Sequence, residues 1–414
     1  MTQTLMLQYA LDPTENQEQA LRSHAGAVRL AYNHALYEIY QNWNAVKKGE
    51  ETEYLKTNHY AIRKRFNKIK DEKYPWWNEN SKEAYSTGAM NAARAFQNYF
   101  DGRSRPPKYK KKSPYSDTEG IIFTTGVRRL DDNRHFTLPK IGKMRLHENA
   151  KKLSWLLHND AKIGNVTVKY QQSRWKLNVT MQVPDDLFLK YVDQRTKRDK
   201  KKIVGIDLGI RKAAVFSDGT VIENPKAFER NVRKLRRLNK ELSRRKKWNR
   251  QTGEVASHRW MKTKRKLEKQ HGKIVNYRVD HAHKLSRHVV DDFKVIGLED
   301  LNVRGMIQGK NMGRSVNDAN FGRIRRFIEY KSAWYGSQVG FVDRFYPSSK
   351  TCSNCGEVKA KLSRNATVFS CDSCGHRMDR DLNAALNIER KVAQSYGETL
   401  NGHGDDGSGS DDSE

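Results

Sequence analysis

Four cysteines near the carboxyl-terminal end of the chain have the spacing of a metal site. They form two C-x-x-C pairs, Cys352 with Cys355 and Cys371 with Cys374, with fifteen residues between the pairs. A glycine follows each pair and lets the backbone turn tightly around an ion. Four thiolates complete the tetrahedral shell of zinc, so we expect a structural Zn²⁺ rather than a catalytic one. Disulfides are the alternative, but they are rare inside cells.

Three acidic residues stand where a strand ends or a helix begins. Asp207 and Glu299 each close an apolar stretch, and Asp381 follows the last cysteine at the start of a helical pattern. Carboxylates are hard oxygen ligands of the kind that Mg²⁺ or Mn²⁺ prefers. In a two-metal site such ions activate the attacking water and stabilise the leaving oxygen of a phosphodiester. The acids therefore predict a catalytic Mg²⁺ (or Mn²⁺) site, and no Ser-His-Asp set, Walker loop or HExxH helix competes with it.

Asp207 and Asp381 also have a structural alternative. Asp207 is close to Gly209 and could form a turn. Asp379 and Asp381 both stand where a helix begins, and Asp is favoured there because its oxygen accepts unpaired backbone N–H groups. The residues alone leave both interpretations open.

An α/β region must position the acids. Apolar strands alternate with helices along the second half of the chain, which predicts an α/β layer with a mixed sheet. The expected strands are an apolar strand that begins at residue 203 and carries Asp207, a second apolar run at 213–216, and the strands 293–301 and 338–346. Two long basic helices are expected within 230–250 and 258–290.

The first half of the chain has a different pattern. Residues 2–11 read as a strand, residues 14–100 have a helical period, and residues 120–183 alternate apolar and polar side chains as half-buried strands do. We expect a small β-barrel with a helical domain inserted between its first and later strands.

Charge indicates the kind of partner. The chain has 79 Lys and Arg against 48 Asp and Glu, a formal charge of +31. A surface this basic is best neutralised by the phosphates of nucleic acid. No apolar stretch approaches the ~20 residues that a membrane span needs, and the start of the chain does not read as a signal peptide. We therefore expect a cytoplasmic, nucleoid-associated protein without a membrane partner.

The chain resembles the TnpB family in four short segments that follow the family's order: "GIDLG", "GLEDLN", "YPSSKTCSNCG" and "DRDLNAALNI". TnpB proteins are transposon-encoded relatives of the type V CRISPR effector nucleases. Two further segments, "AVRLAYNHAL" and "AWYGSQV", extend the similarity over nearly the whole chain.

The resemblance implies an α/β multidomain fold. Its parts would be an RNase H-like (RuvC) nuclease domain with an inserted zinc ribbon, and a wedge-like β-barrel with an inserted helical recognition domain. The implied bounds are 1–12 and 113–195 for the wedge, 13–112 for the recognition domain, 196–346 and 376–396 for the nuclease domain, 347–375 for the ribbon, and 397–414 for a disordered acidic tail.

The resemblance also implies an activity. Asp207, Glu299 and Asp381 match the catalytic, magnesium-binding acids of the family, which leaves Asp379 as a capping residue or a neighbour of the zinc. Such proteins bind a non-coding guide RNA from their own element and cut double-stranded DNA that pairs with it. No HNH-type module is present in the sequence, so a single site would cut both strands, and we expect one protein chain on each RNA.

The same relatives read a short motif beside their target. By position, four residues would contact that motif: Lys82, Ser86, Thr124 and Thr125. Two other functions stay open. A non-cleaving RNA-guided regulator would be expected to lose the carboxylates, and a zinc-ribbon DNA-binding accessory protein of transposition would leave them without a role.

Overall fold

The computed structural model divides into two compact units, Met1–Lys190 and Tyr191–Glu414. The residues that it describes are 2–50, 55, 58–111, 119–193, 199–247, 249, 251–252, 254–308, 312–363 and 366–401. None of the helices within these ranges is both long enough and apolar enough to cross a bilayer.

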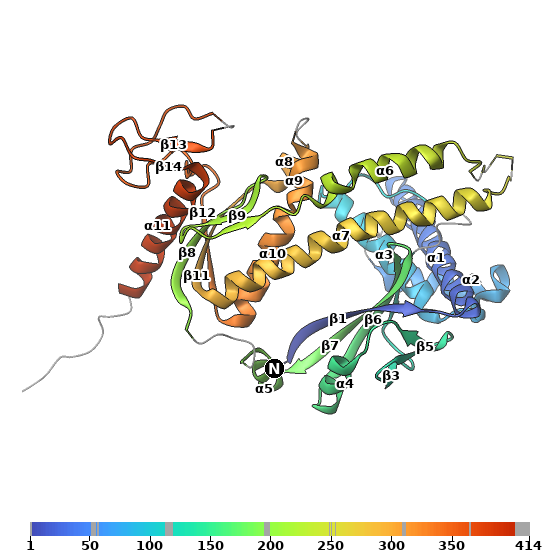
Figure 1. The fold of residues 1–414 in the computed structure, drawn as a ribbon. Coiled ribbons are helices and arrows are strands. Elements are labelled where there is room, and N and C mark those ends of the chain that lie inside the picture. Colours follow the sequence, from blue (N-terminus) through green and yellow to red (C-terminus); the bar gives the residue numbers. More distant parts are fainter. Residues whose placement is uncertain are drawn as a thin grey trace, which may run out of the picture. The chain divides into compact units, whose positions relative to one another are not determined.

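A seven-stranded antiparallel sheet is the framework of the first unit (Figure 1). Its strands pair in the order β2-β6-β7-β1-β5-β4-β3. The strands and the helices that follow them are β1 Thr2–Asp12, β2 Ile121–Phe123, β3 Arg129–Asp132, β4 His135–Leu138, β5 Gly142–Leu146, α4 Lys151–His158, β6 Lys162–Gln171, β7 Arg174–Pro184 and α5 Asp185–Asp193.

The pairings of the described strands do not close this sheet into the expected barrel. The order of pairing is linear, and its ends are β2 and β3. These end strands have only three and four residues. Strands this short offer few backbone groups for a closing ladder.

Three helices lie between the first strand and the rest of this sheet. They are α1 Glu15–Lys47, α2 His59–Lys73 and α3 Lys82–Phe100, with the short 3-10 helix η1 Pro75–Glu79 before α3. β1 precedes the helices in the chain, yet it pairs with β7 from Thr2↔Pro184 to Leu11↔Trp175. The helices share their own core, which includes Leu36, Ile62 and Phe96.

The second unit contains a mixed five-stranded sheet, which confirms the predicted α/β layer. Its order is β10-β9-β8-β11-β12. β8, β11 and β12 run parallel to one another, whereas β9 and β10 are antiparallel to their neighbours. The bounds are β8 Lys201–Asp207, β9 Lys212–Phe216, β10 Val221–Glu223, β11 Phe293–Glu299 and β12 Gln338–Val342.

Helices accompany this sheet, and a short hairpin carries the cysteines. The helices are α6 Ala227–Ser243, α7 His258–Asp292, α8 Val303–Gln308, α9 Gly313–Ala319, α10 Phe321–Tyr335 and α11 Arg380–Asn401, and the hairpin strands are β13 Val368–Ser370 and β14 Arg377–Asp379. α11 continues past residue 396, where the sequence predicts the acidic tail to begin. Residues 402–414 of that tail lie outside the described residues.

Candidate functional site

Asp207 and Glu299 end neighbouring parallel strands. β8 and β11 pair with Leu298 opposite Ile206, so the next residues, Glu299 and Asp207, leave the sheet at the same edge. In open α/β sheets this edge, at the carboxyl ends of parallel strands, is where ligands bind.

Three glycines form a stripe across the same strands, because Gly205, Gly297 and Gly340 are in register on β8, β11 and β12. A Cβ atom on Gly205 would lie 2.1 Å from the carbonyl oxygen of Ala385 and 2.4 Å from the backbone nitrogen of Glu389, both in α11. Cβ atoms on Gly297 and Gly340 would meet side chains of α11 at 3.0 and 2.7 Å. The glycine stripe is therefore the surface on which α11 lies.

The glycine stripe also directs the acids toward the start of α11. Side chains two residues apart on a strand share a face. Asp207 and Glu299 each follow a stripe glycine by two residues, so both point to the face that α11 covers. Asp381 is the second residue of α11. The structure thus brings the three predicted acids together from three separate segments.

We expect Gly205→Ala to destabilise the protein by about 3 kcal/mol, because its new methyl group would meet backbone atoms, which cannot rotate away. Thermal unfolding measures the change. Gly322→Ala is the matched control, since its Cβ would lie 3.8 Å from a side-chain atom of Val303, which is an ordinary contact. Equal melting temperatures for the two variants would contradict the close approach of α11.

Burial and charge crowding act on the same acids. Burial, followed by the charges of Glu299 and Asp381, raises the pKa of Asp207 to about 8, although Arg380 opposes this rise. Burial also raises the pKa of Glu299, against the effect of a hydrogen bond that Ser348 Oγ donates to its carboxylate. A divalent cation would remove the repulsion among these groups, so the donor set fits Mg²⁺ or Mn²⁺.

This pKa shift predicts that Asp207→Asn stabilises the metal-free protein at neutral pH. Between about pH 4 and pH 8 the folded state keeps a proton on Asp207 that the unfolded state has lost, so stability falls as the pH rises through this window. Asparagine has no charge to desolvate. In chelator, we expect the variant to gain about 1 to 3 kcal/mol at pH 8 and little near pH 4 in thermal unfolding. A gain that does not change with pH would exclude this cause.

The two aspartates at the start of α11 have different partners. Asp381 Oδ1 accepts hydrogen bonds from Nε and Nη2 of Arg380, at 3.1 and 2.8 Å. Asp379 Oδ1 accepts the backbone N–H groups of Asp381 and Leu382 at 3.0 and 3.1 Å, and its Oδ2 pairs with Lys212 Nζ at 2.8 Å. The capping interpretation is therefore confirmed for Asp379.

The four cysteines converge on one point. Their Sγ atoms all lie within 4.8 Å of one another, with 3.7 Å between Cys352 and Cys374 and 3.6 Å between Cys355 and Cys371. Four sulfurs that each lie about 2.3 Å from one zinc ion are about 3.8 Å apart in a tetrahedron. The cysteines form no disulfide, so the cluster could hold a zinc ion as the sequence predicts.

The acids are less tightly gathered than the thiolates. Within the described ranges, the cysteine cluster is the one group of three or more His, Cys, Asp or Glu residues whose donor atoms converge closely enough to hold an ion. Glu299 is engaged by Ser348, and Asp381 by Arg380. One oxygen of each of these two carboxylates is therefore already in a hydrogen bond.

Two buried asparagines join the cysteine ribbon to α11. Asn383 Nδ2 donates to the carbonyl of Thr351 at 2.7 Å, and Asn383 Oδ1 accepts the N–H of Ser353 at 2.9 Å. One turn later, Asn387 Nδ2 donates to the carbonyls of Thr351 and Ser348 at 2.6 and 2.9 Å. These contacts couple the ribbon to the helix that carries the third acid. The signal in the sequence is the spacing of the two amides, four residues apart on an apolar helix.

In the first unit, the residues expected to contact a DNA motif lie around a carboxylate that sequence reasoning missed. Glu83 is buried in the first turn of α3. Its carboxylate accepts Thr124 Oγ1 at 2.9 Å, the backbone N–H of Thr125 at 3.1 Å, and also Thr125 Oγ1. Lys82 is exposed and Ser86 half-buried, one residue before and three after Glu83 on the same helix. Glu83 thus fixes both threonines to α3.

Three family models match parts of the chain. The model described as "Cas12f1-like, TNB domain" matches residues 321–388, "Probable transposase" matches residues 177–309, and "Helix-turn-helix domain" matches residues 1–48. In the structure, the described part of this last range is the strand β1 followed by the single helix α1.

Similar proteins cover nearly the whole chain. One from Mycobacterium tuberculosis (strain CDC 1551 / Oshkosh) is 32% identical and covers 92% of this chain and 85% of its own length. One from Streptomyces pristinaespiralis is 31% identical and covers 92% and 87%. Both are named "Putative RNA-guided DNA endonuclease".

The fold resembles that in the "Cryo-EM structure of the Cas12f1-sgRNA-target DNA complex". The TM-score is 0.54 and the identity 15%, and the match covers 94% of this chain and 99% of that one.

Proposed function

Because the chain belongs to the TnpB family of transposon-encoded proteins, we propose that it is an RNA-guided DNA endonuclease that depends on Mg²⁺ or Mn²⁺. Its substrate is double-stranded DNA that pairs with a bound guide RNA. The observation that carries this proposal is that Glu299, at the end of β11, and Asp381, at the start of α11, lie near enough to Asp207, at the end of β8, to raise its pKa by their charge.

The second unit supports an RNase H-like, RuvC-type domain. Three antiparallel strands, β10, β9 and β8, are continued by the parallel strands β11 and β12. α11 packs on β8, and the cysteine ribbon stands between β12 and α11 in the chain. Asp207 and Glu299 end two neighbouring strands of this sheet, and Asp381 begins the helix that packs on it, which supports a shared site.

The chain's own residues prepare the site for phosphodiester hydrolysis. When bound, divalent cations supply an activated water and stabilise the leaving oxygen. Asp207, Glu299 and Asp381 would hold these cations, and Asp207 must first give up its proton. Ser348 and Arg380 keep Glu299 and Asp381 oriented until then. The cysteine cluster would hold Zn²⁺ in a structural role, because four thiolates leave no open position.

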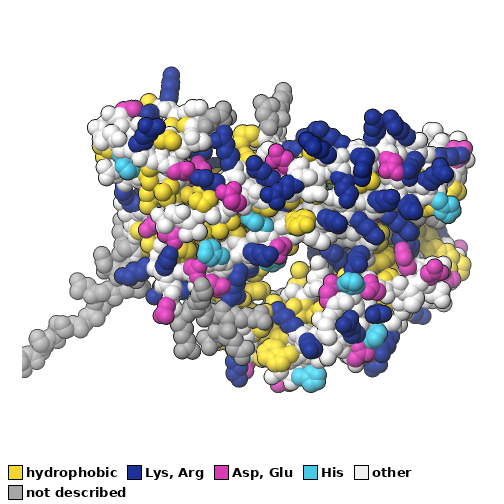
Figure 2. Space-filling model, in the orientation of Figure 1, with side chains coloured by type: hydrophobic (Ala, Val, Ile, Leu, Met, Phe, Trp, Pro, Cys, Tyr) yellow, Lys and Arg dark blue, Asp and Glu magenta, His cyan; other side chains and the backbone are white. Residues whose placement is uncertain are grey.

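The basic surface supports guide RNA and target DNA as partners. On the face shown in Figure 2, Lys and Arg side chains gather over α6 and α7. Six exposed cations belong to α6: Arg230, Arg233, Lys234, Arg236, Arg237 and Lys240. Phosphates that bind such a surface release counterions, so affinity should fall steeply with salt. We propose one protein chain per RNA, acting on DNA inside the cell.

Lys82, Ser86, Thr124 and Thr125 are the proposed contacts to a motif beside the target. We expect Glu83→Ala to relax the choice of this motif, because both threonines lose the carboxylate that fixes them. The lost hydrogen bonds should also cost about 1 to 2 kcal/mol of stability. Cleavage of a library with randomised flanking bases measures the preference.

Glu72→Ala is the matched control for this prediction, since it removes an exposed carboxylate from α2. If the motif preference of Glu83→Ala equals that of Glu72→Ala, the proposed role of Glu83 is wrong.

The proposed function is tested by the RNA that the protein binds. The chain should be expressed with its transposon, and the RNA that copurifies should be sequenced. We expect one discrete non-coding RNA, and replacing its targeting segment should redirect DNA cutting to the new complementary sequence. Binding at the new sequence without cutting would instead indicate an RNA-guided regulator, and the absence of any RNA would indicate an accessory DNA-binding protein.

A further inference from the structure

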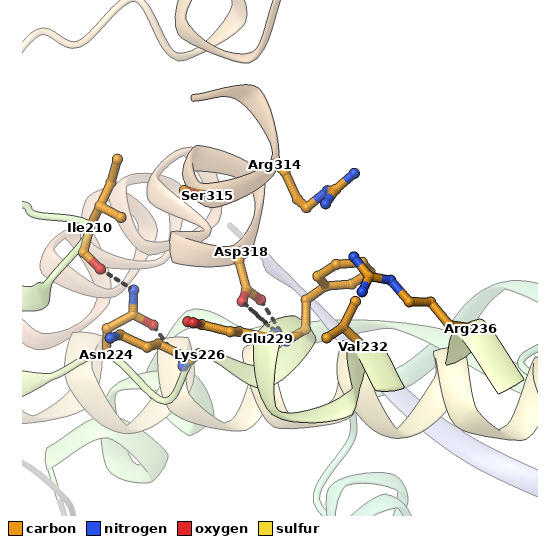
Figure 3. A pocket seen from close by; sticks show the side chains of 10 residues that line it. Ile210, Asn224, Lys226, Glu229, Val232, Arg236, Arg314, Ser315 and Asp318 are labelled. Carbon is orange, nitrogen blue, oxygen red and sulfur yellow. Dashed lines mark hydrogen bonds between the residues drawn. The ribbon is translucent and has the colours of Figure 1, made fainter. Parts of the chain in front are cut away.

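A cavity of about 280 Å³ opens beside the start of α6 in the second unit (Figure 3). Its lining includes the apolar side chains of Ile210, Phe228 and Val232. A flat aromatic ring beside aliphatic side chains suits a planar apolar group such as a nucleobase, which stacks on aromatic rings in proteins that bind single strands.

Cationic side chains line the same cavity. They are Lys226 directly before α6, Arg236 in the middle of α6, and Arg314 from α9. In Figure 3, Arg236 and Arg314 reach from different helices into the same part of the pocket. The guanidinium carbon of Arg314 lies 5.8 Å from the centroid of the Phe228 ring. Glu229 contributes the one exposed carboxylate of the lining, so the positive charges dominate there.

The cavity is built before any ligand arrives. The buried carboxylate of Asp318 accepts the backbone N–H of Phe228 at 2.9 Å and that of Glu229 at 3.3 Å, and it pairs with Arg278 at 2.7 Å. Asp318 therefore already satisfies the first amides of α6. An anionic ligand in this cavity would be held by the arginine side chains and not by the helix terminus.

The cavity is close to the proposed catalytic acids. Ile210 follows Asp207 by three residues, so their Cα atoms are at most about 11 Å apart. Asn224 Nδ2 donates to the carbonyl of Ile210 at 2.7 Å, and Leu208 and Ile210 pack against the cluster that contains Val316 of α9. Along a nucleic-acid strand, 11 Å corresponds to about three nucleotides at a 3.4 Å rise, and fewer if the strand is extended.

We propose that this cavity is a subsite for one unpaired nucleotide of the strand that is cut. The base lies against Phe228 and Val232, and the adjoining phosphate is bound by Arg236 and Arg314. A base within a duplex cannot enter, because both of its faces and its pairing edge are occupied. The inference rests on the proposed nuclease function, and it assigns the cavity lined by Phe228, Arg236 and Arg314, next to the proposed catalytic acids, to a single base and its phosphate.

The test measures binding of a short fluorescein-labelled single-stranded DNA to the full chain with its copurified RNA, in the cleavage-deficient Asp207→Asn background. A single abasic site is moved along the DNA. At one position we expect it to weaken binding roughly 5- to 150-fold, which is the contribution of one stacked base. Ser315→Phe, which fills the cavity from the exposed surface of α9 without changing its charge, should remove that sensitivity, whereas Ser315→Thr should keep it.

The contribution of positive charge to binding is tested with two arginine variants on α6. Both Arg233 and Arg236 are exposed, but only Arg236 lines the cavity. We expect Arg236→Ala to weaken binding several-fold more than Arg233→Ala.

The inference is overturned if no abasic position weakens binding, if Ser315→Phe leaves the sensitivity unchanged, or if the two arginine variants bind equally. These outcomes concern binding alone, so they are separate from a failure of the wild-type protein to cut DNA, which would instead refute the nuclease proposal.

Discussion

Asp207→Asn should lower the rate of guide-directed DNA cleavage by at least about a thousandfold, because it removes the central carboxylate of the proposed cation site. Asp207 is the acid that both Glu299 and Asp381 act on electrostatically. Asparagine keeps the size of the side chain but supplies only a neutral oxygen, a far weaker ligand for Mg²⁺. Binding of the guide RNA should change by less than about twofold, since it depends on phosphate contacts elsewhere.

Asp218→Asn is the control for this experiment. Asp218 lies in the turn after β9 and pairs with Lys201 at 2.7 Å, so its loss removes an acid from the same sheet without touching the proposed site. Single-turnover cleavage at saturating Mg²⁺ measures both variants. Cleavage that persists in Asp207→Asn, or that falls equally in Asp218→Asn, would show that the cations are held elsewhere.

Cys352→Ser should release zinc and lower cleavage by about tenfold to a hundredfold, although no cysteine belongs to the proposed catalytic site. Cys352 is fully buried, and its neighbour Thr351 accepts hydrogen bonds from both Asn383 and Asn387. Loss of one thiolate opens the metal shell and loosens the segment that these asparagines hold. The start of α11, and Asp381 with it, then loses its support.

Metal analysis and cleavage should be measured on the same preparation of Cys352→Ser. Ser370→Ala, an exposed change on β13 of the ribbon, is the control and should keep one zinc per chain. Full zinc content in Cys352→Ser would contradict the assignment of ligands. Zinc loss with undiminished cleavage would show that the ribbon and α11 are not coupled.

The sequence predicts the chemistry of the second unit well, because ligand types and their spacing are local properties. The two C-x-x-C pairs predict a cluster whose sulfur atoms indeed converge. The apolar stretches before Asp207 and Glu299 predict acids at strand ends, and the parallel pairing of β8 with β11 brings these two ends to the same edge of the sheet. The assignment of these acids to catalysis stays a prediction.

Other features depend on contacts between distant segments, which composition and periodicity do not encode. The close approach of α11 to Gly205 requires knowing which helix covers which strand. Glu83 reads as an ordinary acid in the first turn of a helix, and only the fold brings Thr124 and Thr125 to it. The expected barrel closure failed for a similar reason, because the alternation that predicts strands does not say whether the ladder between the end strands forms.

The glycine stripe under α11 limits how far this helix can move relative to the sheet. At Gly205 main chain faces main chain, so the gap between helix and sheet contains no side chain that could rotate to absorb a displacement. The distance between Asp381 and the two acids of the sheet is therefore set by backbone atoms, which have little freedom to move. Attempts to reshape this protein for new targets should therefore find Gly205 intolerant of even a methyl group, whereas Gly297 and Gly340 face side chains of α11 that can shift.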